Sequence, residues 1–427
     1  MTRLISDPKI FKAKALKWAS TFRVFCYLDS NSFNDQYSKF DTLIAVGVID
    51  EIVADAGNAF DKLAQFRTKN TDWITGFFGY DLKNEIEDLS SDHADSLKFP
   101  DLYFFAPQHL IIVRDYEVEI IATNAKYIFD CIEKQAFHSS ECNSPSIKNI
   151  KSKFSKAKYL STFKKIKAHI IRGDIYVTNF CQEFFSDHAL IDPLAVFLKL
   201  NEVSPNPFTA FFKWNNNYII CASPERFLAK RGSKIISQPI KGTAKRGETA
   251  EKDEQLKKQL RNHTKELQEN VMIVDIVRND LSRSAKQGTV QTEQLFDIYS
   301  FKQVHQMIST IVCELKEGIT SIQAIKNSFP MGSMTGAPKI KAIQLMEQYE
   351  KSRRGVYSGA IGYFNPDNDF DFNVVIRSLL YNQTNKYLSF HAGSAITYYA
   401  DAEKEYEECL LKAKAILEAL GNPDVSL

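Results

Sequence analysis

The chain has 427 residues, of which 25% are charged and 44% hydrophobic, and its formal net charge is +2. These values are typical of a soluble globular protein with one large domain or two ordinary ones, and they exclude a strongly basic nucleic-acid or membrane-surface binder. The seven cysteines are scattered without a C-x-x-C pair, which argues against a zinc site or a disulfide framework and favours a reducing compartment. No segment approaches the roughly 20 apolar residues of a membrane helix, and no signal peptide is visible, so we predict a cytoplasmic protein.

The first 150 residues mix helical and strand patterns. We expect helices over residues 1–20 and 124–133, and strands at 22–28, 42–49, 73–80, 110–113 and 117–121. The segment 138–155 is rich in Ser, Asn and Lys and is the best candidate for a linker. It divides the chain into a part spanning residues 1–150 and a part spanning residues 151–427.

The second part has a denser pattern of elements. Its predicted helices cover residues 156–172, 193–201, 249–281 and 402–420, with a further helix after Pro338. Its predicted strands cover residues 175–185, 208–213, 218–222, 226–230, 233–237, 358–364, 372–381 and 387–391. Arg231 and Gly232 predict a hairpin turn between two of these strands.

The stretch 238–247 contains the first candidate reactive group. Pro239 cannot donate to a central ladder, so we expect the preceding strand to end or to reach a sheet edge there. Lys241 would then lie at a strand end, beside Gly242, which allows close backbone approach to a ligand, and Thr243, which offers a hydroxyl. A lysine in a partly desolvated pocket can act as a nucleophile, but taken alone these residues favour a solvated lysine in a turn. Glu225 lies in a nearby turn, as an ordinary surface charge or as a member of the same pocket.

Two helices each carry a pair of carboxylates three residues apart, and hence on one face. The pairs are Glu266 with Glu269, and Glu405 with Glu408, and Lys412 follows one turn after the second pair. Four carboxylates would make an oxygen site of the kind that Mg²⁺ accepts. Either pair alone more often marks a solvated face, and periodicity does not show that the pairs converge.

Two further features suggest the binding of an anion. The glycine-bearing loop 329–339 leads into a helix, with Thr335 as the expected N-cap and Pro338 in the first turn, so its N–H groups can hold an anion or simply cap the helix. The loop is neither G-x-G-x-x-G nor a P-loop, so a nucleotide is not implied. Arg377 lies in a predicted apolar strand and needs a carboxylate partner, from the protein or from a ligand.

Eight stretches, in this order, resemble the chorismate-utilising enzymes, a family that includes anthranilate, aminodeoxychorismate, isochorismate and salicylate synthases. They read S-P-E-R-F, P-I-K-G-T, E-N-V-M-I-V-D-I-V-R-N-D-L, H-Q-M-I-S-T, G-S-M-T-G-A-P-K, Y-S-G-A-I-G-Y, I-R-S and E-Y-E-E-C-L-L-K. The resemblance covers about residues 155–420, and residues 1–150 match only loosely. It implies an α+β fold of two large antiparallel β-sheets packed together with helices on the outside, with residues 1–150 packing into the same sandwich and residues 151–427 binding chorismate.

The resemblance also implies a role for each matching residue. Residues that look like the Mg²⁺ ligands are Glu266, Glu269, Glu405 and Glu408. Residues that look like the substrate-binding set are Gly242, Thr243, Ser333, Tyr357, Arg377, Gly393 and Lys412. His305 resembles the histidine near the departing C4 hydroxyl of chorismate, and Glu225 is the expected partner for proton transfer.

Lys241 separates the branches of this family, because anthranilate, isochorismate and salicylate synthases carry alanine at this position of the motif. Lysine is similar to the aminodeoxychorismate synthases, in which it is thought to attack C2 of chorismate before ammonia adds at C4. The resemblance therefore implies formation of 4-amino-4-deoxychorismate for 4-aminobenzoate and folate synthesis. The chain shows no glutaminase motif, so a separate glutamine amidotransferase subunit is expected to supply the ammonia.

Two departures and two alternatives accompany this reading. Val177 stands where close relatives usually carry glutamine and isochorismate synthases carry their lysine base, which speaks against isochorismate formation. Ala395 replaces a second glycine usual after Gly393. The nearest alternative is an anthranilate synthase component I. An alternative of another class is a non-catalytic regulator that binds chorismate or tryptophan, because residues 27–31 resemble a tract where some relatives bind tryptophan.

Overall fold

The structure is a computed structural model that describes residues 1–136, 147, 149–301 and 304–422. Residues 137–146 and 148 of the predicted linker lie outside the described residues, as does Cys142. The end of that segment forms a short strand, β7 (Lys151–Ser152). No helix among the described residues is both long enough and apolar enough to cross a membrane.

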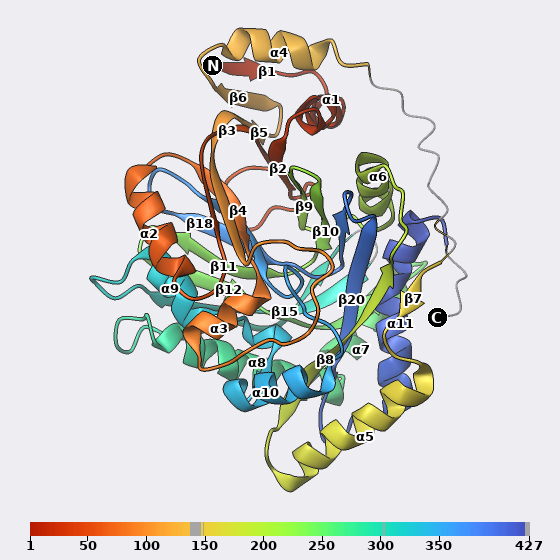
Figure 1. Cartoon of the computed structure of the whole chain (residues 1–427). Helices are drawn as coiled ribbons and strands as arrows, with labels where there is room; N and C mark the ends of the chain where they lie inside the picture. Colours follow the sequence, from red (N-terminus) through yellow and green to blue (C-terminus); the bar gives the residue numbers. More distant parts are fainter. Residues whose placement is uncertain (137–146, 148, 302–303, 423–427) are drawn as a thin grey trace.

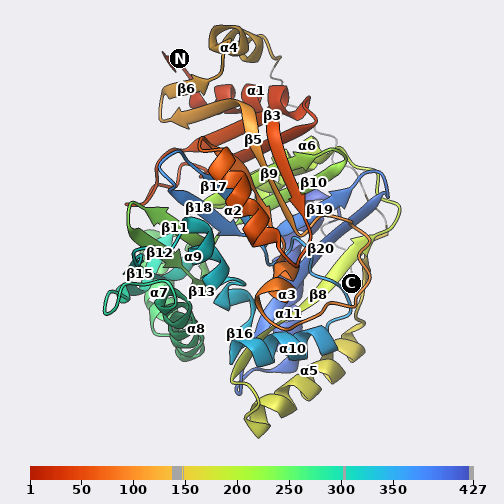
Figure 2. The same ribbon diagram turned by 60° about the vertical axis from the view of Figure 1, so that its left-hand side comes forward.

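The strands of the described chain form one continuous antiparallel ladder that folds into two layers (Figures 1 and 2). The first layer contains β2 (Val24–Asp29), β9 (Phe208–Trp214), β10 (Asn217–Ser223), β19 (Ser378–Asn382), β20 (Tyr387–Ile396), β8 (Val177–Ser186) and β16 (Gly336–Ala337). The second layer contains β4 (Ile74–Phe78), β17 (Ala360–Phe364), β18 (Phe370–Val374), β11 (Arg226–Arg231), β12 (Lys234–Gln238), β15 (Val304–Glu314), β13 (Ile240–Lys245) and β14 (Gln291–Ser300). These two layers confirm the expected fold class.

Two long strands join the layers. β3 (Thr42–Ala54) pairs with β2, and β5 (Leu102–Arg114) pairs with β3 and with β4. The β3–β5 pairing shifts register between Val48 and Asp50, where a bulge adds a bend. At the far end of β5, β6 (Glu117–Ile121) pairs with β1 (Thr2–Leu4). Strands from both sides of residue 150 therefore alternate in one ladder, because β2 pairs with β9 and β4 pairs with β17.

Helices cover the outer faces of the two layers. Those beside the first layer are α1 (Pro8–Ser20), α4 (Ala125–Glu133), α5 (Lys156–Arg172), α6 (Pro193–Val203), α10 (Lys339–Tyr349) and α11 (Ala402–Ala419). Those beside the second layer are α2 (Ala59–Lys69), α3 (Lys83–Ile86), α7 (Ala250–Arg261), α8 (Thr264–Ser282) and α9 (Ser321–Ser328).

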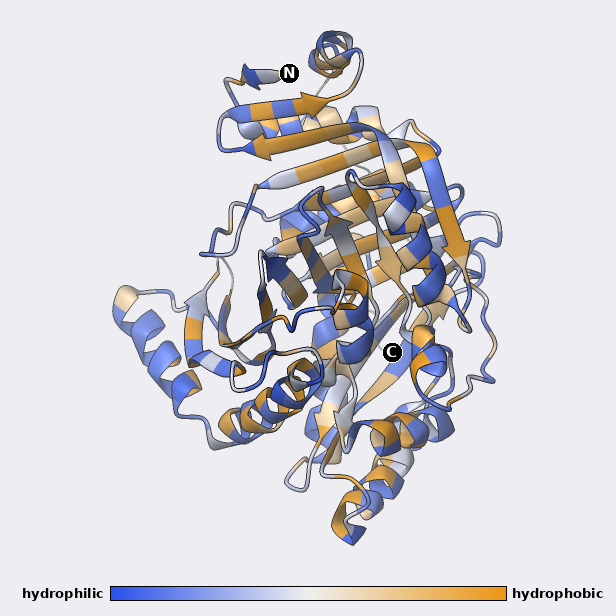
Figure 3. Cartoon of the chain, turned by 90° about the vertical axis from the view of Figure 1, so that its left-hand side faces the viewer, coloured by the Kyte–Doolittle hydropathy of each residue, from blue (hydrophilic) through white to orange (hydrophobic). Residues whose placement is uncertain are grey.

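Two large apolar cores hold the layers and helices together. Phe77 of β4 packs edge-on against Phe212 of β9 with ring centroids 5.5 Å apart, so one core lies between the layers. The other core lies under the outer helices and includes Phe163 and Ile166 of α5. Figure 3 shows the central strands as predominantly hydrophobic and the outer helices as striped, the pattern expected when a helix buries one face.

Several predicted elements need correction. Residues 249–281 form two helices, because the side chain of His263 accepts from the backbone N–H of Glu266 and starts α8 anew. Residues 372–381 form β18 and β19, separated by a turn in which Arg377 has a left-handed φ of +52°. Ile171 and Val271, apolar residues of the predicted helices 156–172 and 249–281, are exposed.

The loop before α10 also differs from the prediction. Pro338, not Thr335, occupies the N-cap position, and α10 begins at Lys339. The Thr335 hydroxyl instead donates to the carbonyl of Met331 at 3.2 Å. The two residues after Thr335 form β16 and pair with the start of β8, so this loop is tied to the first layer of the ladder.

Candidate active site

Lys241 lies in β13, close to the point where the pairing with β15 is irregular. The register shifts between Ile240 and Thr243, and Gly242 in the bulge has a φ of +89°. Strand β12 ends at Gln238, as Pro239 predicts, but the chain resumes at once as β13, so Lys241 is the second residue of a new strand and does not end the preceding one. The bulge turns this part of the strand out of the regular ladder.

The ammonium of Lys241 lies among carboxylates from three different elements. Burial raises the pKa of Glu225, in the turn between β10 and β11, and of Glu269 on α8, and the positive charge of Lys241 opposes both changes. The same charge also favours the ionised form of Glu408 on α11. Gly242 packs against α8, because a Cβ on this glycine would lie 3.2 Å from Oε2 of Glu266. The structure therefore gathers side chains that the sequence spreads over more than 180 residues.

Glu225 is the acid best suited to exchange a proton near neutral pH. Its side chain is buried, and burial raises its pKa from 4.5 to about 7, although Ser333, Lys241 and Lys412 act in the opposite direction. Glu225 and Ser333 line one cavity together with Pro239. The buried Ser333 hydroxyl has no hydrogen-bond partner among the described residues.

The two acidic pairs converge around a lysine that sequence reasoning missed. Nζ of Lys265 lies 2.8 Å from Oε1 of Glu405, 3.6 Å from Oε1 of Glu269 and 4.0 Å from Oε2 of Glu408. Burial raises the pKa of Glu269 and of Glu405. The i, i+4 spacing of Lys265 and Glu269 on one helix was a sequence signal for this contact.

Lys412 links the second acidic pair to the strand β20. Its Nζ lies 2.7 Å from Oε1 of Glu408 and donates to the carbonyl of Gly393 at 2.8 Å. Burial favours the neutral amine, yet Glu408 holds the pKa of Lys412 above its usual value. Burial likewise raises the pKa of Glu408, but Lys412 holds it below its usual value. A Cβ on Gly393 would lie 2.6 Å from Sγ of Cys181, so only glycine fits at this point of the β8–β20 pair.

Arg377 and Tyr357 lie close to each other and to Glu408. Burial lowers the pKa of the Arg377 guanidinium, while Tyr357 and Glu408 oppose that change. The ring of Tyr357 stacks on His391 with centroids 4.8 Å apart, and its hydroxyl lies 3.7 Å from Sγ of Cys181. The Arg377 side chain is half-buried, and a guanidinium in this position can donate to an anionic ligand.

His305 has its two ring nitrogens engaged by protein. One lies 2.8 Å from Oδ1 of Asp253 on α7, and the other lies 2.9 Å from the Ser300 hydroxyl. Arg246 and the backbone N–H of Gly247 also bind the Asp253 carboxylate, at 2.9 Å and 2.7 Å. The structure thus places His305 at the end of a polar chain, and Asp253 is a second functional candidate that sequence reasoning missed.

Three further residues singled out in the sequence are placed as follows. Thr243 is exposed on β13, opposite Gln306 of β15. Val177 is buried at the start of β8, opposite Ala337 of β16. Ala395 is buried in β20, opposite Asn179.

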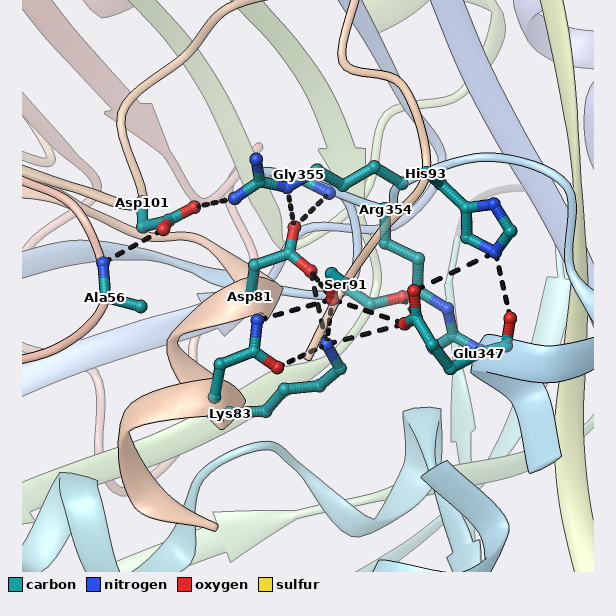
Figure 4. A network of polar contacts seen from close by, with 12 residues as sticks. Ala56, Asp81, Lys83, Ser91, His93, Asp101, Glu347, Arg354 and Gly355 are labelled. Atoms are coloured by element: carbon teal, nitrogen blue, oxygen red, sulfur yellow. Dashed lines mark hydrogen bonds and ion pairs between the residues drawn. The ribbon is translucent and has the colours of Figure 1, made fainter. Parts of the chain in front are cut away.

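A buried polar network supports the loops around the site (Figure 4). Arg354 donates to the carbonyls of Met334 at 2.7 Å and of Asn179 at 2.9 Å, and it pairs with Glu350 at 2.6 Å. Asp81 accepts from the backbone N–H of Gly355 at 3.1 Å. The loop that carries Ser333 and the turn before Tyr357 are thereby fixed to each other and to the N-terminal part of the chain.

The Asp81 end of this network contains a fully buried lysine. Lys83 lies 3.3 Å from Asp81 and 3.6 Å from Glu347 of α10. His93 also contacts Glu347, through the backbone carbonyl at 2.9 Å (Figure 4). Breaking a buried pair of this kind leaves an uncompensated charge, so the network fixes the geometry of these segments.

Another cavity lies beside the predicted tract 27–31. It is lined by Leu28, Asp29 and Ser30 of that tract, and by Arg226 of β11 among others. Arg226 is buried and binds Asp35 at 2.8 Å and Asp371 at 3.0 Å.

The four glutamates have the donor chemistry of a magnesium site. Oε1 of Glu269 and Oε2 of Glu405 are buried without a hydrogen-bond partner among the described residues, and two such oxygens suit a hard cation. In the described part of the chain, however, no three acidic, His or Cys side chains already converge as a ligand set, because Lys265 lies between the carboxylates. The residues fit Mg²⁺ once this ammonium moves aside.

Comparison with known proteins identifies relatives of this chain. The chain is 35% identical over 383 residues to a probable chloroplastic aminodeoxychorismate synthase of rice, a match that covers 80% of this chain and 42% of that protein. It is 31% identical to aminodeoxychorismate synthase component 1 of Bacillus subtilis, covering 81% and 76% of the two chains, and 30% identical to anthranilate synthase component 1 of Aquifex aeolicus, covering 81% and 74%. The chain spans about two fifths of the length of the rice protein and of a similar Arabidopsis protein, 42% and 40%.

Solved structures show the same fold. Anthranilate synthase component I of Streptococcus pneumoniae superposes with a TM-score of 0.76 at 23% identity, covering 90% of this chain and 95% of that one. A menaquinone-specific isochorismate synthase of Escherichia coli gives a TM-score of 0.75 at 14% identity, covering 98% and 95%. The family model for chorismate binding enzymes matches residues 25–418, which include both sheet layers and every candidate residue described above. The chain is therefore a member of the chorismate binding enzyme family.

Proposed function

We propose that the chain is an aminodeoxychorismate synthase, which converts chorismate and ammonia into 4-amino-4-deoxychorismate and water. The single observation that carries this proposal is the position of Lys241 among three carboxylates. Its positive charge favours the ionised forms of Glu225, Glu269 and Glu408. A lysine in this position is a nucleophile beside an acid that titrates near neutrality. Relatives named aminodeoxychorismate synthase support the same activity.

The substrate would be held by its carboxylates. Arg377 supplies a half-buried guanidinium, Tyr357 supplies a hydroxyl near it, and Ser333 supplies a hydroxyl in the cavity that Glu225 lines. Glu266, Glu269, Glu405 and Glu408 would hold Mg²⁺, and the ion would supply positive charge against a substrate carboxylate. These assignments place the ring between α8, α11 and the bulge in β13.

The chemistry can be written as two balanced displacements. In the first, the free amine of Lys241 forms a bond to C2, both ring double bonds shift, from C1=C2 and C5=C6 to C1=C6 and C4=C5, and the C4–O bond breaks. Glu225 gives its proton to the departing hydroxyl, which leaves as water, and takes back the proton released by the new C2–N bond. In the second, ammonia bonds to C4, both double bonds shift back, and the C2–N bond breaks. A proton passes from the added ammonia to the departing nitrogen, which restores the lysine amine.

The ammonia is proposed to come from a separate glutamine amidotransferase. The name "component 1" of the Bacillus relative supports a partner subunit. The six free cysteines among the described residues support a reducing compartment such as the cytoplasm.

A mass measurement tests the proposal directly. Protein mixed with chorismate and Mg²⁺ but no ammonia should gain the mass of chorismate less one water, and the added mass should map to the peptide that contains Lys241. With ammonia and an added lyase, the same protein should yield 4-aminobenzoate. Lys241→Ala should abolish both results, whereas Lys245→Ala, on an exposed residue of the same strand, should retain them. Direct release of fluorescent anthranilate by the wild-type chain would instead assign it to the anthranilate synthases.

A further inference from the structure

Lys265 is the cation at the centre of the acidic cluster. Its ammonium donates to Oε1 of Glu405 at 2.8 Å, and lies 3.6 Å from Glu269 and 4.0 Å from Glu408. The first contact joins α8 to α11 across 140 residues of sequence. The ammonium therefore holds together two helices whose facing carboxylates would otherwise repel each other.

One lysine does not satisfy this cluster. Glu405 and Glu269 are 1% and 7% exposed, and each keeps one buried carboxylate oxygen, Oε2 and Oε1 respectively, without a hydrogen-bond partner among the described residues. Oε1 of Glu269 is the oxygen that lies 3.6 Å from the Lys265 ammonium, which is beyond hydrogen-bond distance. Buried carboxylate oxygens without hydrogen bonds are costly. They lie where a second positive charge would be most stabilising. A divalent cation carries two charges on one ion, so it supplies the second charge without the burial of another side chain.

The lysine side chain also has a way out. Lys265 lies in the first turn of α8, and its side chain is 33% exposed, so its long flexible stem can carry the ammonium to solvent. A magnesium ion binds its oxygen ligands at about 2.0–2.1 Å, shorter than the 2.8 Å contact of the ammonium. The ion and the ammonium cannot share the centre of the cluster.

We infer that Lys265 is an internal counter-cation that occupies the glutamate cluster of the metal-free chain and is displaced to solvent when Mg²⁺ binds. It keeps α8 and α11 in register before the metal arrives, and it competes with the metal for the same oxygens. The inference rests on the metal site of the proposed function, but it concerns binding and not turnover. It makes the apparent Mg²⁺ affinity a property of this lysine as well as of the four glutamates.

Chemical labelling of lysines in the wild-type protein tests displacement directly. Brief acylation followed by peptide mass spectrometry should show modification of Lys265 rising several-fold when MgCl₂ replaces NaCl at equal ionic strength. Lys151 of β7, which pairs with Asp187 at 3.0 Å, is the matched control, and its modification should not change with MgCl₂. Unchanged labelling of Lys265 in protein shown by calorimetry to be saturated with Mg²⁺ would overturn the inference.

Calorimetric titration with MgCl₂ gives an independent test. Lys265→Met should bind Mg²⁺ at least about tenfold more tightly than wild type, because the competing ammonium is gone, and its metal-free form should melt at a lower temperature. Lys404→Met removes the same charge from an exposed position on α11 and should change the affinity less than about twofold, because surface charges are screened. Weaker or equal binding by Lys265→Met would contradict the inference. Absence of Mg²⁺ binding in all three proteins would contradict the metal site itself and the inference with it.

Discussion

Nε2 of His305 lies 2.8 Å from Oδ1 of Asp253, a residue of the exposed helix α7. The carboxylate also accepts from Arg246 and from the backbone N–H of Gly247, and these contacts lower the pKa of Asp253. Asp253 therefore stays ionised at neutral pH and orients an imidazole that is fully buried. If His305 assists departure of the C4 hydroxyl, Asp253 is the residue that positions it.

We expect Asp253→Asn to lower kcat for 4-amino-4-deoxychorismate formation by about 10²-fold, the lower end of what a general acid or base contributes. KM for chorismate should change little, because the carboxylate-binding residues are untouched. His305→Gln should have a similar effect, and the double variant should be no worse than either single one. Additive losses would show that Asp253 acts independently of His305. Asp275→Asn, on the exposed face of α8, is the control for removal of a surface carboxylate.

Glu225 predicts a pH-dependent difference in stability. Burial raises its pKa from 4.5 to about 7, so between these pH values the folded protein keeps a proton that the unfolded chain has released. Stability from this group is full below about pH 4.5 and falls as the pH rises to 7, by about 3 kcal/mol in all. Glu225→Gln removes this titration while keeping the side-chain shape.

The melting temperature of Glu225→Gln, relative to wild type, should therefore rise from pH 5 to about pH 7 and level off above it. Thermal unfolding of both metal-free proteins at four pH values measures the difference. Glu317→Gln, on an exposed turn residue, should show a difference that does not vary with pH. A pH-independent difference for Glu225→Gln would mean that the carboxyl is ionised in the folded protein throughout this range.

Arg377 predicts a selective effect on substrate binding. Its half-buried guanidinium interacts electrostatically with Tyr357, Glu408 and Lys412, and its donors remain for a substrate carboxylate. Arg377→Ala should raise KM for chorismate about 10- to 100-fold, in line with the loss of a charged hydrogen bond. Arg377→Lys should recover only part of this loss, since an ammonium lacks the planar fork. Arg23→Ala, on an exposed arginine, should leave KM unchanged; equal KM values for Arg377→Ala and wild type would remove Arg377 from the substrate site.

Much of the fold could be predicted because apolar periodicity was strong. The helices at 156–172 and 402–420 were predicted within one residue of their observed ends, and most strands within a few residues. The break after Asn262 was missed because it depends on a side-chain cap by His263 and not on hydrophobic pattern. The split of residues 372–381 was missed because arginine seldom adopts a left-handed φ, so nothing in the sequence indicates the turn.

The arrangement of the candidate site residues could likewise be predicted only in part. Ordered motifs singled out Lys241, Glu225 and the four glutamates, and the structure brings Lys241 near Glu225, Glu269 and Glu408, while their roles stay predictions. The position of Lys265 between α8 and α11 could not be predicted, since it depends on how two helices 140 residues apart pack. The contact of His305 with Asp253 could likewise not be predicted from the sequence, because it joins a strand to a separate helix.

Removal of a carboxylate partner of the buried Arg226 should cause a large loss of stability, and a second substitution at Arg226 should restore part of it. It is 3% exposed, and its guanidinium binds Asp371 of β18 at 3.0 Å and Asp35 of the N-terminal part at 2.8 Å. Asp371→Ala should lower the free energy of unfolding by about 3–5 kcal/mol, because it leaves a buried guanidinium short of a partner. Urea unfolding of wild type and variant at neutral pH measures this loss.

The matched control removes both charges. Arg226→Met combined with Asp371→Leu should be more stable than Asp371→Ala alone, because no charge of this pair is then buried unpaired and the two apolar side chains fill the space. The double variant leaves Asp35 without Arg226 and Arg231 without Asp371, so it should remain below wild type. If Asp371→Ala cost less than about 1 kcal/mol, the range measured for exposed ion pairs, water would reach this guanidinium in the folded protein and the pair would behave as a surface contact.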